Sequence, residues 1–416
     1  MSDYFFSTFK PDLNTVNSLF EKKITNSPFQ KINMFFYSNN KNIFTTSKIF
    51  VIYDGVIYNE LGKTVSTNTE QYIMDCYLEY GTIFTRFIDG EFSIILVDYE
   101  KNICVFSTDI FGTKPLYYSI EDNKFVLCTY LSVLGKMSNN SIRANPNTIY
   151  VYNLQTNVLT TDKIYEFSIA QYKKDFDDWN MAFEKSILKR LNGLESIIPL
   201  SSGYDSGAIC CEANKQHMKF KAVSFTGKEN MEVLEERIKL IKNNYILNYS
   251  KNDYYSILKK FLKEAEHYRD DDYELIRDES SIGIGLICEY AKKQNVNYII
   301  SGSGADSIYS YTNIDDFCIE ESINKWNNIF PENLENFFPW QNFFNGNMQR
   351  YLFQEEYISR LYGIQIRYPF LDKCLVQEFL WLDSSLKNQF YKSPIQNYLI
   401  QNNYPYDCTK KIGFYI

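Results

Sequence analysis

Residues 196–207 read SIIPLSSGYDSG, and this stretch decides the fold of the larger part of the chain. The apolar run at 196–200 predicts a buried strand, and residues 208–216 (AICCEANKQ) continue as a helix. Small residues between a strand and a helix N-terminus leave backbone N–H groups pointing outward, an arrangement that suits a phosphate. The loop is not a Walker motif, and it contains Asp205, which could hold Mg²⁺ on a phosphate. An ordinary strand–helix turn rich in capping residues would have the same composition.

A second loop of small residues follows another predicted strand. The strand at 297–301 runs into SGSGADS (301–307), which places Asp306 at an offset similar to that of Asp205. Open α/β sheets bind ligands at the carboxyl ends of their strands. Two such loops, each with one carboxylate, together predict a site for a polyphosphate carrying Mg²⁺.

The chain before residue 165 has the period of strands. Alternating or β-rich runs lie at 34–37, 49–53, 92–98, 103–107, 115–119, 149–153 and 156–160. One helix is expected at 68–80, with Asn68 or Thr69 as its N-cap. This half of the chain is therefore expected to be rich in β-structure.

Beyond residue 175 the hydrophobic period changes to that of helices. Helical spacing at 176–192, 229–243, 253–266 and 281–293 alternates with apolar strands at 196–200, 221–225 and 297–301. Strand–helix–strand alternation predicts a parallel sheet with helices on both faces, and the remainder, 317–416, reads as mostly helical. We therefore expect an α/β two-domain protein with domains at 1–168 and 169–416.

Composition excludes several classes of function. The 416 residues carry 43 basic and 51 acidic side chains, a formal charge of −8, which argues against a sequence-independent nucleic-acid binder. With only His217 and His267, a histidine-rich metal site is excluded. The nine cysteines form no CxxC pair, the first residues (MSDYFFSTFKPDL) lack an apolar core, and no apolar run reaches membrane length. We expect a cytoplasmic protein with free thiols and no membrane span.

Several segments after residue 200 resemble the synthetase half of the asparagine synthetase family. Ser201–Ser206 resembles the SGGxDS pyrophosphate loop of ATP-pyrophosphatases, and Ser301–Asp306 resembles the family's second loop, SGEGSDE. Residues 363–372 (GIQIRYPFLD) are similar to GVEARVPFLD. Residues 411–414 (KIGF) resemble the lysine segment near the end of the family's synthetase domain, closest in form to the KxGxH of β-lactam synthetases. These segments occur in the order of the family.

The N-terminal half resembles the glutaminase half of the same family. Residues 54–59 (DGVIYN) resemble NGEIYN, and residues 89–93, 109–112 and 114–118 resemble DGMFAF…RDHLGIIPLYYG. The resemblance implies an N-terminal Ntn-type αββα sandwich. It implies that a parallel-sheet ATP-pyrophosphatase domain, of the adenine nucleotide α-hydrolase type and with a helical C-terminal part, follows the sandwich.

The resemblance also implies a mechanism and a set of site residues. ATP and Mg²⁺ would adenylate a carboxylate, and an amine would then attack the acyl-AMP. Asp205 and Asp306 would hold Mg²⁺, and Lys411, or its neighbour Lys410, would neutralise charge on the α-phosphate. Taken alone, Lys411 would be read as a solvated terminal lysine. The implied ATP contacts are Leu200, Ser201, Ser202, Gly203, Tyr204, Asp205, Ser206, Ser224, Ser301, Gly302 and Gly304.

The glutaminase half departs from the family's pattern at its catalytic positions. Residue 2 is Ser2 instead of the N-terminal Cys, although an N-terminal serine could still be a nucleophile. Asp54 replaces the asparagine whose amide helps to form the oxyanion hole, and a carboxylate would repel the developing oxyanion. Residues 25–50 contain no arginine to bind the glutamine carboxylate. We predict that this domain does not hydrolyse glutamine.

The synthetase half departs where a general base is expected. Ser303 stands where asparagine synthetases carry Glu and β-lactam synthetases carry Tyr, and a serine is a poor base unless it is activated. Glu355 and Glu356 are the nearest acidic candidates by motif order, although both would also fit a solvated helix face. We name Ser303, Glu355 and Lys411 as the candidate catalytic residues.

Other candidate residues have simpler interpretations. His267, Asp270 and Asp271 could be imagined as metal ligands, but a charged loop fits this segment better, and His217 reads as a surface residue. Cys210 and Cys211, which follow the first loop, are expected to pack as small apolar groups.

Loss of the ammonia source favours a ligase for an amine already present in its substrate, as in β-lactam synthetases and lasso-peptide cyclases. The expected partners are a small-molecule or peptide carboxylate and amine and a biosynthetic partner protein, with a homodimer left open. Neither nucleic acid nor membrane is expected. Asparagine synthesis from free or partner-supplied ammonia, and a catalytically silent scaffold, remain the alternatives.

Overall fold

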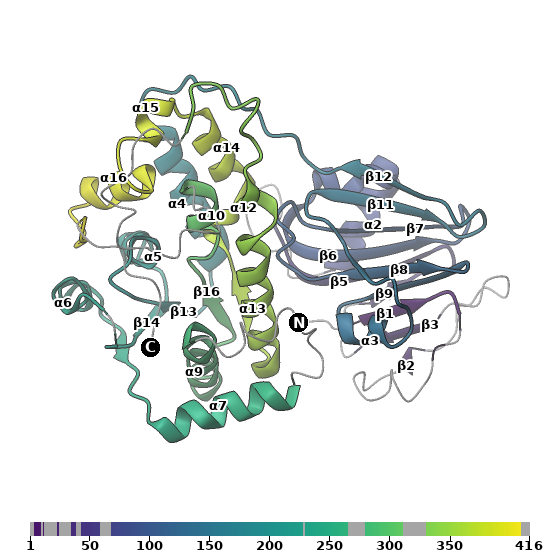
Figure 1. The fold of residues 1–416 in the computed structure, drawn as a ribbon, viewed down its shortest axis with the longest axis horizontal. Coiled ribbons are helices and arrows are strands. Elements are labelled where there is room, and N and C mark those ends of the chain that lie inside the picture. The colour runs from purple at the N-terminus through teal and green to yellow at the C-terminus, as the bar shows by residue number, and fades with distance from the viewer. Residues whose placement is uncertain are drawn as a thin grey trace. The chain divides into compact units, whose positions relative to one another are not determined.

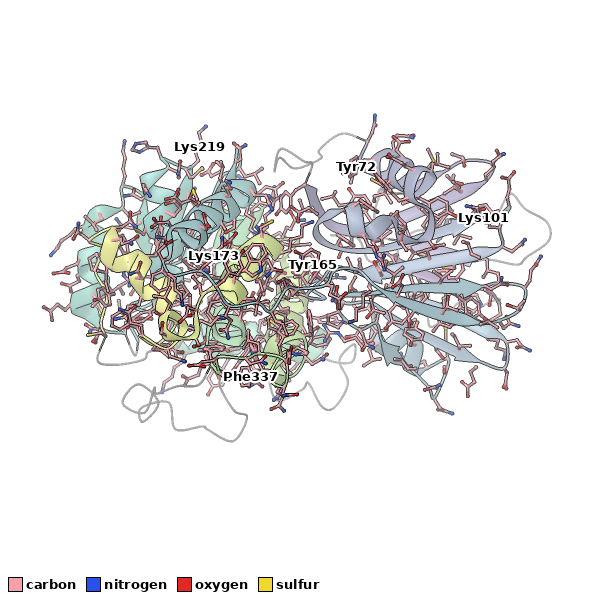
Figure 2. All side chains as sticks on the ribbon, turned by 90° about the horizontal axis from the view of Figure 1, so that it is seen from above. Tyr72, Lys101, Tyr165, Lys173, Lys219 and Phe337 are labelled. Atoms are coloured by element: carbon pink, nitrogen blue, oxygen red, sulfur yellow. The ribbon has the colours of Figure 1, made fainter. Side chains whose placement is uncertain are left out.

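The computed structural model describes residues 4–9, 11, 23–24, 35–38, 43–58, 68–227, 229–264, 279–310 and 330–408. It divides into two compact units, Met1–Glu166 with Lys260–Glu274, and Phe167–Lys259 with Leu275–Ile416. The segment around the division is anchored on each side within its own unit. Tyr165 exchanges two hydrogen bonds of 2.8 Å with the Asn147 side chain, whereas Lys173 pairs with Asp178 and Glu378. Tyr165 and Lys173 are labelled in Figure 2.

The first unit contains two six-stranded sheets whose strand pairs are antiparallel (Figure 1). One sheet has the order β10-β8-β9-β1-β3-β2 and the other β12-β11-β7-β6-β5-β4. The strands of the first sheet are β1 (Tyr4–Ser7), β2 (Lys23–Ile24), β3 (Phe35–Ser38), β8 (Tyr117–Glu121), β9 (Lys124–Cys128) and β10 (Ile142–Arg143). Those of the second are β4 (Ile43–Thr45), β5 (Ile49–Tyr58), β6 (Asp89–Asp98), β7 (Ile103–Thr108), β11 (Thr148–Asn153) and β12 (Leu159–Lys163).

Strand alternation builds two cores in this unit. Phe50 and Ile52 of β5 face residues of the first sheet, whereas Val51 and Tyr53 face helix α2 (Thr69–Tyr80) and the 3₁₀ helix η1 (Gly81–Phe87). The first core lies between the sheets, and helix α3 (Leu131–Gly135) packs on β8 and β9. These layers form the predicted αββα sandwich. The cap prediction was partly wrong, because Asn68 is left-handed at the N-cap of α2 and its side chain makes no capping hydrogen bond.

The second unit is built on a five-stranded sheet whose strand pairs are all parallel, in the order β15-β14-β13-β16-β17. The strands are β13 (Ser196–Pro199), β14 (Phe220–Ser224), β15 (Asn244–Ile246), β16 (Tyr298–Ile300) and β17 (Gln365–Arg367). The parallel sheet predicted from the strand–helix alternation is confirmed.

Helices pack around this sheet in two groups. Helices α4, α5, α14 and α16 pack on one another, and α9 packs on α13, which contacts β17. The longer helices are α4 (Asp177–Leu191), α5 (Tyr204–Lys215), α6 (Met231–Leu240), α7 (Lys251–Glu264), α9 (Glu279–Lys293), α13 (Asn347–Tyr362), α14 (Lys373–Trp381) and α16 (Ser393–Gln401). Short helical turns are α10 (Ala305–Tyr309), α12 (Gln341–Phe344), α15 (Ser384–Lys387) and the 3₁₀ turn η5 (Pro369–Leu371). In the described part of the chain, no helix combines the length and apolar character that crossing a membrane requires.

The strand order reverses between β13 and β16, which are neighbours through Ile197 and Ile299. From β13 the chain proceeds through α5 to β14 on one side, and from β16 it proceeds through α13 to β17 on the other. Connections that leave neighbouring strands in opposite directions open a crevice at the carboxyl ends of those strands. Both predicted loops begin at this point.

Candidate active site

The two predicted loops meet because glycines allow close approach. A Cβ on Gly302 would lie 3.0 Å from Cβ of Asp205, so the second loop lies against the start of α5. Gly304 has φ +94° and caps α10, and a Cβ there would meet Leu371 at 2.4 Å. Only glycine adopts this conformation without strain in so little space. These contacts bring the first turns of α5 and α10 together.

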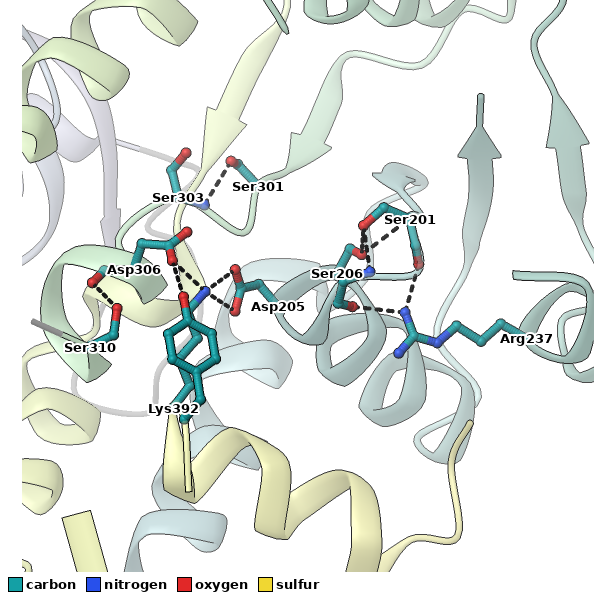
Figure 3. A network of polar contacts seen from close by, with 11 residues as sticks. Ser201, Asp205, Ser206, Arg237, Ser301, Ser303, Asp306, Ser310 and Lys392 are labelled. Atoms are coloured by element: carbon teal, nitrogen blue, oxygen red, sulfur yellow. Dashed lines mark hydrogen bonds and ion pairs between the residues drawn. The ribbon is translucent and has the colours of Figure 1, made fainter. Parts of the chain in front are cut away.

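Asp205 and Asp306 converge on one cation, the ammonium of Lys392 (Figure 3). Its Nζ lies 2.8 and 2.6 Å from the two carboxylate oxygens of Asp205 and 2.9 Å from Oδ1 of Asp306. Lys392 lies just before α16, and its side chain is 3% exposed, against 22% for Asp205 and 49% for Asp306. Burial alone would lower the pKa of Lys392, but the charges of both aspartates outweigh it and raise the pKa above its ordinary value.

Tyr391 adds a further contact to this cluster. Its hydroxyl donates to Oδ1 of Asp306 at 2.8 Å, and its ring lies near that of Tyr204 on the first loop. Burial and the charges of Asp306 and Asp205 raise the pKa of Tyr391 well above its ordinary value, so it remains a neutral donor. The two aspartates are thus held by donors from one segment, Tyr391–Lys392.

The two carboxylates fit Mg²⁺, with the ammonium of Lys392 as a stand-in cation. Among the described residues, no group of three or more His, Cys, Asp or Glu side chains could hold a metal ion by itself. Mg²⁺ is commonly bound by one or two carboxylates completed by substrate phosphates and water. Asp205 and Asp306 supply such a pair, and the remaining ligands would come from the nucleotide.

The first loop is shaped by serine hydroxyls. Ser206 Oγ accepts from the N–H of Ser201 at 3.0 Å and lies 2.8 Å from Ser201 Oγ, which accepts from the N–H of Gly203 at 3.1 Å. Both the N–H of Ser202, at 2.6 Å, and its hydroxyl donate to Oε2 of Glu229. The carboxylate of Glu229 therefore already accepts the hydrogen bonds of Ser202, a residue that the sequence assigned to phosphate binding. Phosphate can bind to Ser202 only after Glu229 has given up these hydrogen bonds.

Ser303 and Glu355 lie together in the structure. Oε1 of Glu355 accepts from the hydroxyl of Ser303 at 2.7 Å and from that of Ser301 at 2.9 Å. Glu355 is 9% exposed and Glu356 is fully buried, so a solvated helix face is the wrong interpretation for both. Oε1 of Glu356 accepts instead from the hydroxyl of Tyr368 at 2.8 Å. Of the two acidic candidates, Glu355 is the one that contacts the second loop.

The remaining predicted positions are less informative. The N–H of Leu200 donates to Val223 at 2.8 Å, and the carbonyl of Ser224, at the end of β14, accepts from Leu247 at 2.8 Å, so these backbone atoms hold the sheet edge. Cys210 and Cys211 are buried on α5, where burial raises the pKa of both thiols, and they pack as predicted. His217 is exposed, as expected. Predicted residues outside the described ranges are Ser2, His267, Asp270, Asp271, Lys410 and Lys411.

In the first unit, Asp54 lies on β5 directly opposite Ser93 of β6 and is fully buried. The hydroxyl of Ser93 accepts from Tyr4 at 2.7 Å, so this position is packed beneath the start of β1. Asp109, in a segment that resembles the glutaminase pattern, accepts from the N–H groups of Phe92, Phe111 and Thr113. Burial raises the pKa of Asp109 to about 6 against these hydrogen bonds. The Asp109 segment is therefore a structural turn of the sandwich.

Three residues of the site were missed by sequence reasoning: Lys392, Glu229 and Arg237. Arg237 of α6 donates to the carbonyls of Ser201 and Gly203 (Figure 3). Lys392 and Arg237 come from segments without a glycine loop, and Lys392 is 187 residues from Asp205. Glu229 follows Gly227 in the loop after β14, but that loop has no Asp and no serine run like those of the two predicted loops. Near Lys392, the local signal is Pro394 in the first turn of α16, which identifies a helix start and not a site.

Two family models match the sequence, one of a glutamine amidotransferase domain over residues 41–174 and one of asparagine synthase over residues 180–316. Among curated proteins, the chain is 25% identical over 419 residues to glutamine-hydrolysing asparagine synthetase 1 of Methanocaldococcus jannaschii. That alignment covers 88% of this chain and 72% of the relative. It is also 25% identical over 296 residues to the glutamine-hydrolysing asparagine synthetase of Triphysaria versicolor, covering 65% of this chain and 50% of that protein. The chain thus spans about half the length of this plant relative.

Among solved structures, the chain is similar to a glutamine phosphoribosylpyrophosphate amidotransferase from B. subtilis, complexed with ADP and GMP. The sequence identity is 8% and the TM-score 0.30, over 53% of this chain and 65% of that one. This likeness is too weak to bear on the function of the site.

Proposed function

We propose that this chain, which belongs to the asparagine synthetase family and is an ATP-dependent carbon–nitrogen ligase, joins a carboxylate to an amine without hydrolysing glutamine. The carboxylate and the amine belong to a peptide or natural-product substrate, so the product is a cyclic amide. Pyrophosphate and AMP are released.

The observation that carries this proposal is the convergence of Asp205 and Asp306 on one cation position at the reversal of strand order. Phosphoryl and nucleotidyl transfer need positioning and charge neutralisation more than covalent help from the protein. Mg²⁺, when bound by these carboxylates, supplies that neutralisation to the phosphates. The N-terminus of α5 adds backbone donors at the same edge of the sheet.

In the first step, an oxygen of the substrate carboxylate attacks the α-phosphorus of ATP. The bond between that phosphorus and the bridging oxygen breaks, and pyrophosphate leaves with the electron pair. The first loop and Lys392 orient the departing phosphates, Asp205 would hold Mg²⁺, and Lys411, by resemblance, neutralises charge on the α-phosphate. The product of this step is an acyl-adenylate.

In the second step, a neutral amine attacks the acyl carbon and the bond to AMP breaks. The nitrogen must lose one proton as the amide forms. The hydroxyl of Ser303 lies 2.7 Å from Glu355, so it passes this proton to the carboxylate, which acts as the general base. Glu355 thereby supplies the basicity that a serine lacks.

The amine belongs to the substrate because the glutaminase positions lack the required groups. Asp54 is a buried carboxylate where an oxyanion needs a donor, and Ser2 replaces the nucleophilic cysteine. An enzyme that makes no ammonia of its own requires another nitrogen nucleophile. This argument favours a cyclase over an asparagine synthetase.

The test is pyrophosphate and AMP release with Mg²⁺-ATP and a panel of carboxylates, including aspartate and peptides that carry both a carboxylate and an amine. We expect stimulation only by molecules that contain both groups, with no effect of glutamine. Stimulation by aspartate and ammonium alone would support asparagine synthesis instead. No release with any substrate, together with no Mg²⁺-ATP binding, would support a scaffold.

A further inference from the structure

Arg237 lies at the back of the first phosphate loop. It is fully buried, and its Nη1 donates to the carbonyls of Ser201 at 2.6 Å and Gly203 at 2.8 Å. In Figure 3 its guanidinium faces the loop from the side opposite the two aspartates. A carbonyl and the N–H of the next residue point in opposite directions across a trans peptide plane. Arg237 therefore turns the N–H groups of Ser202 and Tyr204 away from itself.

The same guanidinium holds the C-terminal segment Tyr404–Cys408. Its Nε donates to the carbonyl of Pro405 at 2.8 Å, and its Cζ lies 5.4 Å from the centre of the Tyr404 ring. One buried charge thus contacts the loop through one nitrogen and the C-terminal segment through another. The segment leads to Lys411, three residues after Cys408.

Residues around Arg237 strengthen the link between loop and segment. The N–H of Asn230 donates to Ser202 Oγ at 3.1 Å, and its Nδ2 donates to Asp407 at 2.8 Å. The rings of Tyr204 and Tyr406 meet edge to face at 6.0 Å. Both connections join the first loop to the segment that precedes Lys411.

The fold makes room for this charge at a specific place. Gly207 of α5 lies against the guanidinium, and a Cβ there would be 2.5 Å from Cζ of Arg237. Burial lowers the pKa of Arg237, yet an arginine stays charged. A desolvated charge is retained at a cost, and its hydrogen bonds offset that cost only while both the loop and the segment keep their positions.

We propose that Arg237 is a positioning residue that makes the first phosphate loop and segment Tyr404–Cys408 one unit. Filling the loop with pyrophosphate or ATP then orders segment Tyr404–Cys408 further, because Arg237 and Asn230 contact both. The ordering by phosphate rests on the proposed function, whereas the link itself does not.

Amide hydrogen exchange tests the link in the full chain, without ligand and with Mg²⁺-pyrophosphate as the probe. The variants are Arg237→Met, Arg237→Lys and Gly207→Ala, with Arg190→Met as a matched control. Arg190 is also buried, and its side chain donates to the carbonyl of Ser186 and to Asp372.

We expect Arg237→Met to raise exchange in peptides covering Tyr404–Cys408 about tenfold without ligand, and to abolish their further protection by Mg²⁺-pyrophosphate. Gly207→Ala should act in the same direction although alanine is the better helix former, because its Cβ displaces the guanidinium. Arg237→Lys should retain part of the protection through a single donor. If Arg237→Met does not fold, the exchange rates of Gly207→Ala and Arg237→Lys decide whether the link exists.

Unchanged exchange at the segment in the Arg237 variants and in Gly207→Ala would overturn the link, as would an equal increase in Arg190→Met. A wild-type chain that does not bind Mg²⁺-pyrophosphate contradicts the proposed function. In that case, the exchange measured without ligand still tests the link between the first phosphate loop and Tyr404–Cys408.

Discussion

Nζ of Lys392 lies 2.6 Å from Oδ2 of Asp205, and this ion pair occupies the place where a divalent cation is expected. The same ammonium neutralises Asp306, so a cation of the chain itself holds the two carboxylates together. If Mg²⁺ binds, it takes the place of this ammonium between the same two carboxylates.

Lys392→Met should make the protein depend on Mg²⁺. Removing the ammonium leaves two carboxylates close together, and we expect a loss of about 3 kcal/mol of unfolding free energy, since Asp306 is half exposed. Mg²⁺ alone should restore part of this stability in the variant and should do little to wild type, where Lys392 competes. Urea denaturation of both proteins with and without MgCl₂ measures the effect. Equal responses to Mg²⁺ would contradict the shared cation position.

Glu355→Gln should separate the two steps of the reaction. Gln can still accept hydrogen bonds from Ser301 and Ser303, but it cannot take a proton, so amide formation should slow about 100-fold or more. Pyrophosphate exchange, which reports the first step, should be nearly unchanged. Ser303→Ala combined with Glu355→Gln should cost little beyond Glu355→Gln alone, because the two residues act as a unit. An equal loss in both steps would assign Glu355 a structural role.

The first unit should release no glutamate from glutamine. Asp54→Asn alone should leave this unchanged, because Ser2 and the missing arginine are independent losses. A coupled glutamate assay with wild type and Asp54→Asn, in the presence of Mg²⁺-ATP, checks this expectation. Glutamate formation by wild type would show that Ser2 replaces the cysteine as a working nucleophile.

Asp372→Asn should destabilise the second unit. Asp372 is buried 2.6 Å from Lys189 Nζ and 3.0 Å from Arg190 Nη1, and it caps α14. Burial alone would raise the pKa of Asp372, but these two charges hold it well below its ordinary range. Asn retains the cap and removes only the charge, so we expect a loss of about 3–5 kcal/mol at neutral pH.

The stability from Asp372 should also depend on pH in a defined direction. A carboxyl with a lowered folded-state pKa stabilises the fold above its unfolded pKa of about 4, and this contribution disappears as the pH falls further. Denaturation of wild type and Asp372→Asn should therefore converge below pH 4. A constant difference at every pH would contradict the ion-pair account.

Lys387 should give a pH dependence of the same sign at higher pH, with stability that rises above pH 7. Its Nζ donates to Gln171 at 2.5 Å and to the carbonyl of Leu380 at 2.9 Å, and burial lowers its pKa to about 7. Above pH 7 the unfolded chain binds this proton and the folded chain does not, so its contribution rises with pH by up to about 1.4 kcal/mol per unit. Lys387→Met should remove this rise between pH 7 and 9. The slope difference between the two proteins is the measurement.

Local patterns predicted the layers of the fold better than its edges. Alternation in β5 and β6 reflects two cores on opposite faces of one sheet, and this pattern is visible in the sequence. Strands β15 and β17 have three residues each at the edges of the second sheet, too short to show a period. Their existence depends on pairing with β14 and β16, which no local signal encodes.

The site residues also fall into those that local sequence predicts and those that depend on distant contacts. Ser201–Asp205 and Ser301–Asp306 were predictable because strand, loop and helix start follow one another in sequence. Lys392, Glu229 and Arg237 were not, since each reaches the loops from a distant helix or turn through a long side chain. Motif order offered both Glu355 and Glu356, and Glu355 was named. That Glu355 is the one that contacts the second loop follows only from the orientation of α13, because this helix is buried on most of its surface and polar periodicity gives no guidance.

The central claim is that the two loops of the second unit bind Mg²⁺-ATP through Asp205 and Asp306. The most direct test is isothermal titration calorimetry with Mg²⁺-ATP on three proteins. These are wild type, Asp205→Asn and a surface control, Asp253→Asn at the start of α7. We predict saturable binding to wild type and to Asp253→Asn, and binding at least about tenfold weaker in Asp205→Asn. No binding to wild type, or equal affinity in Asp205→Asn, would contradict the claim.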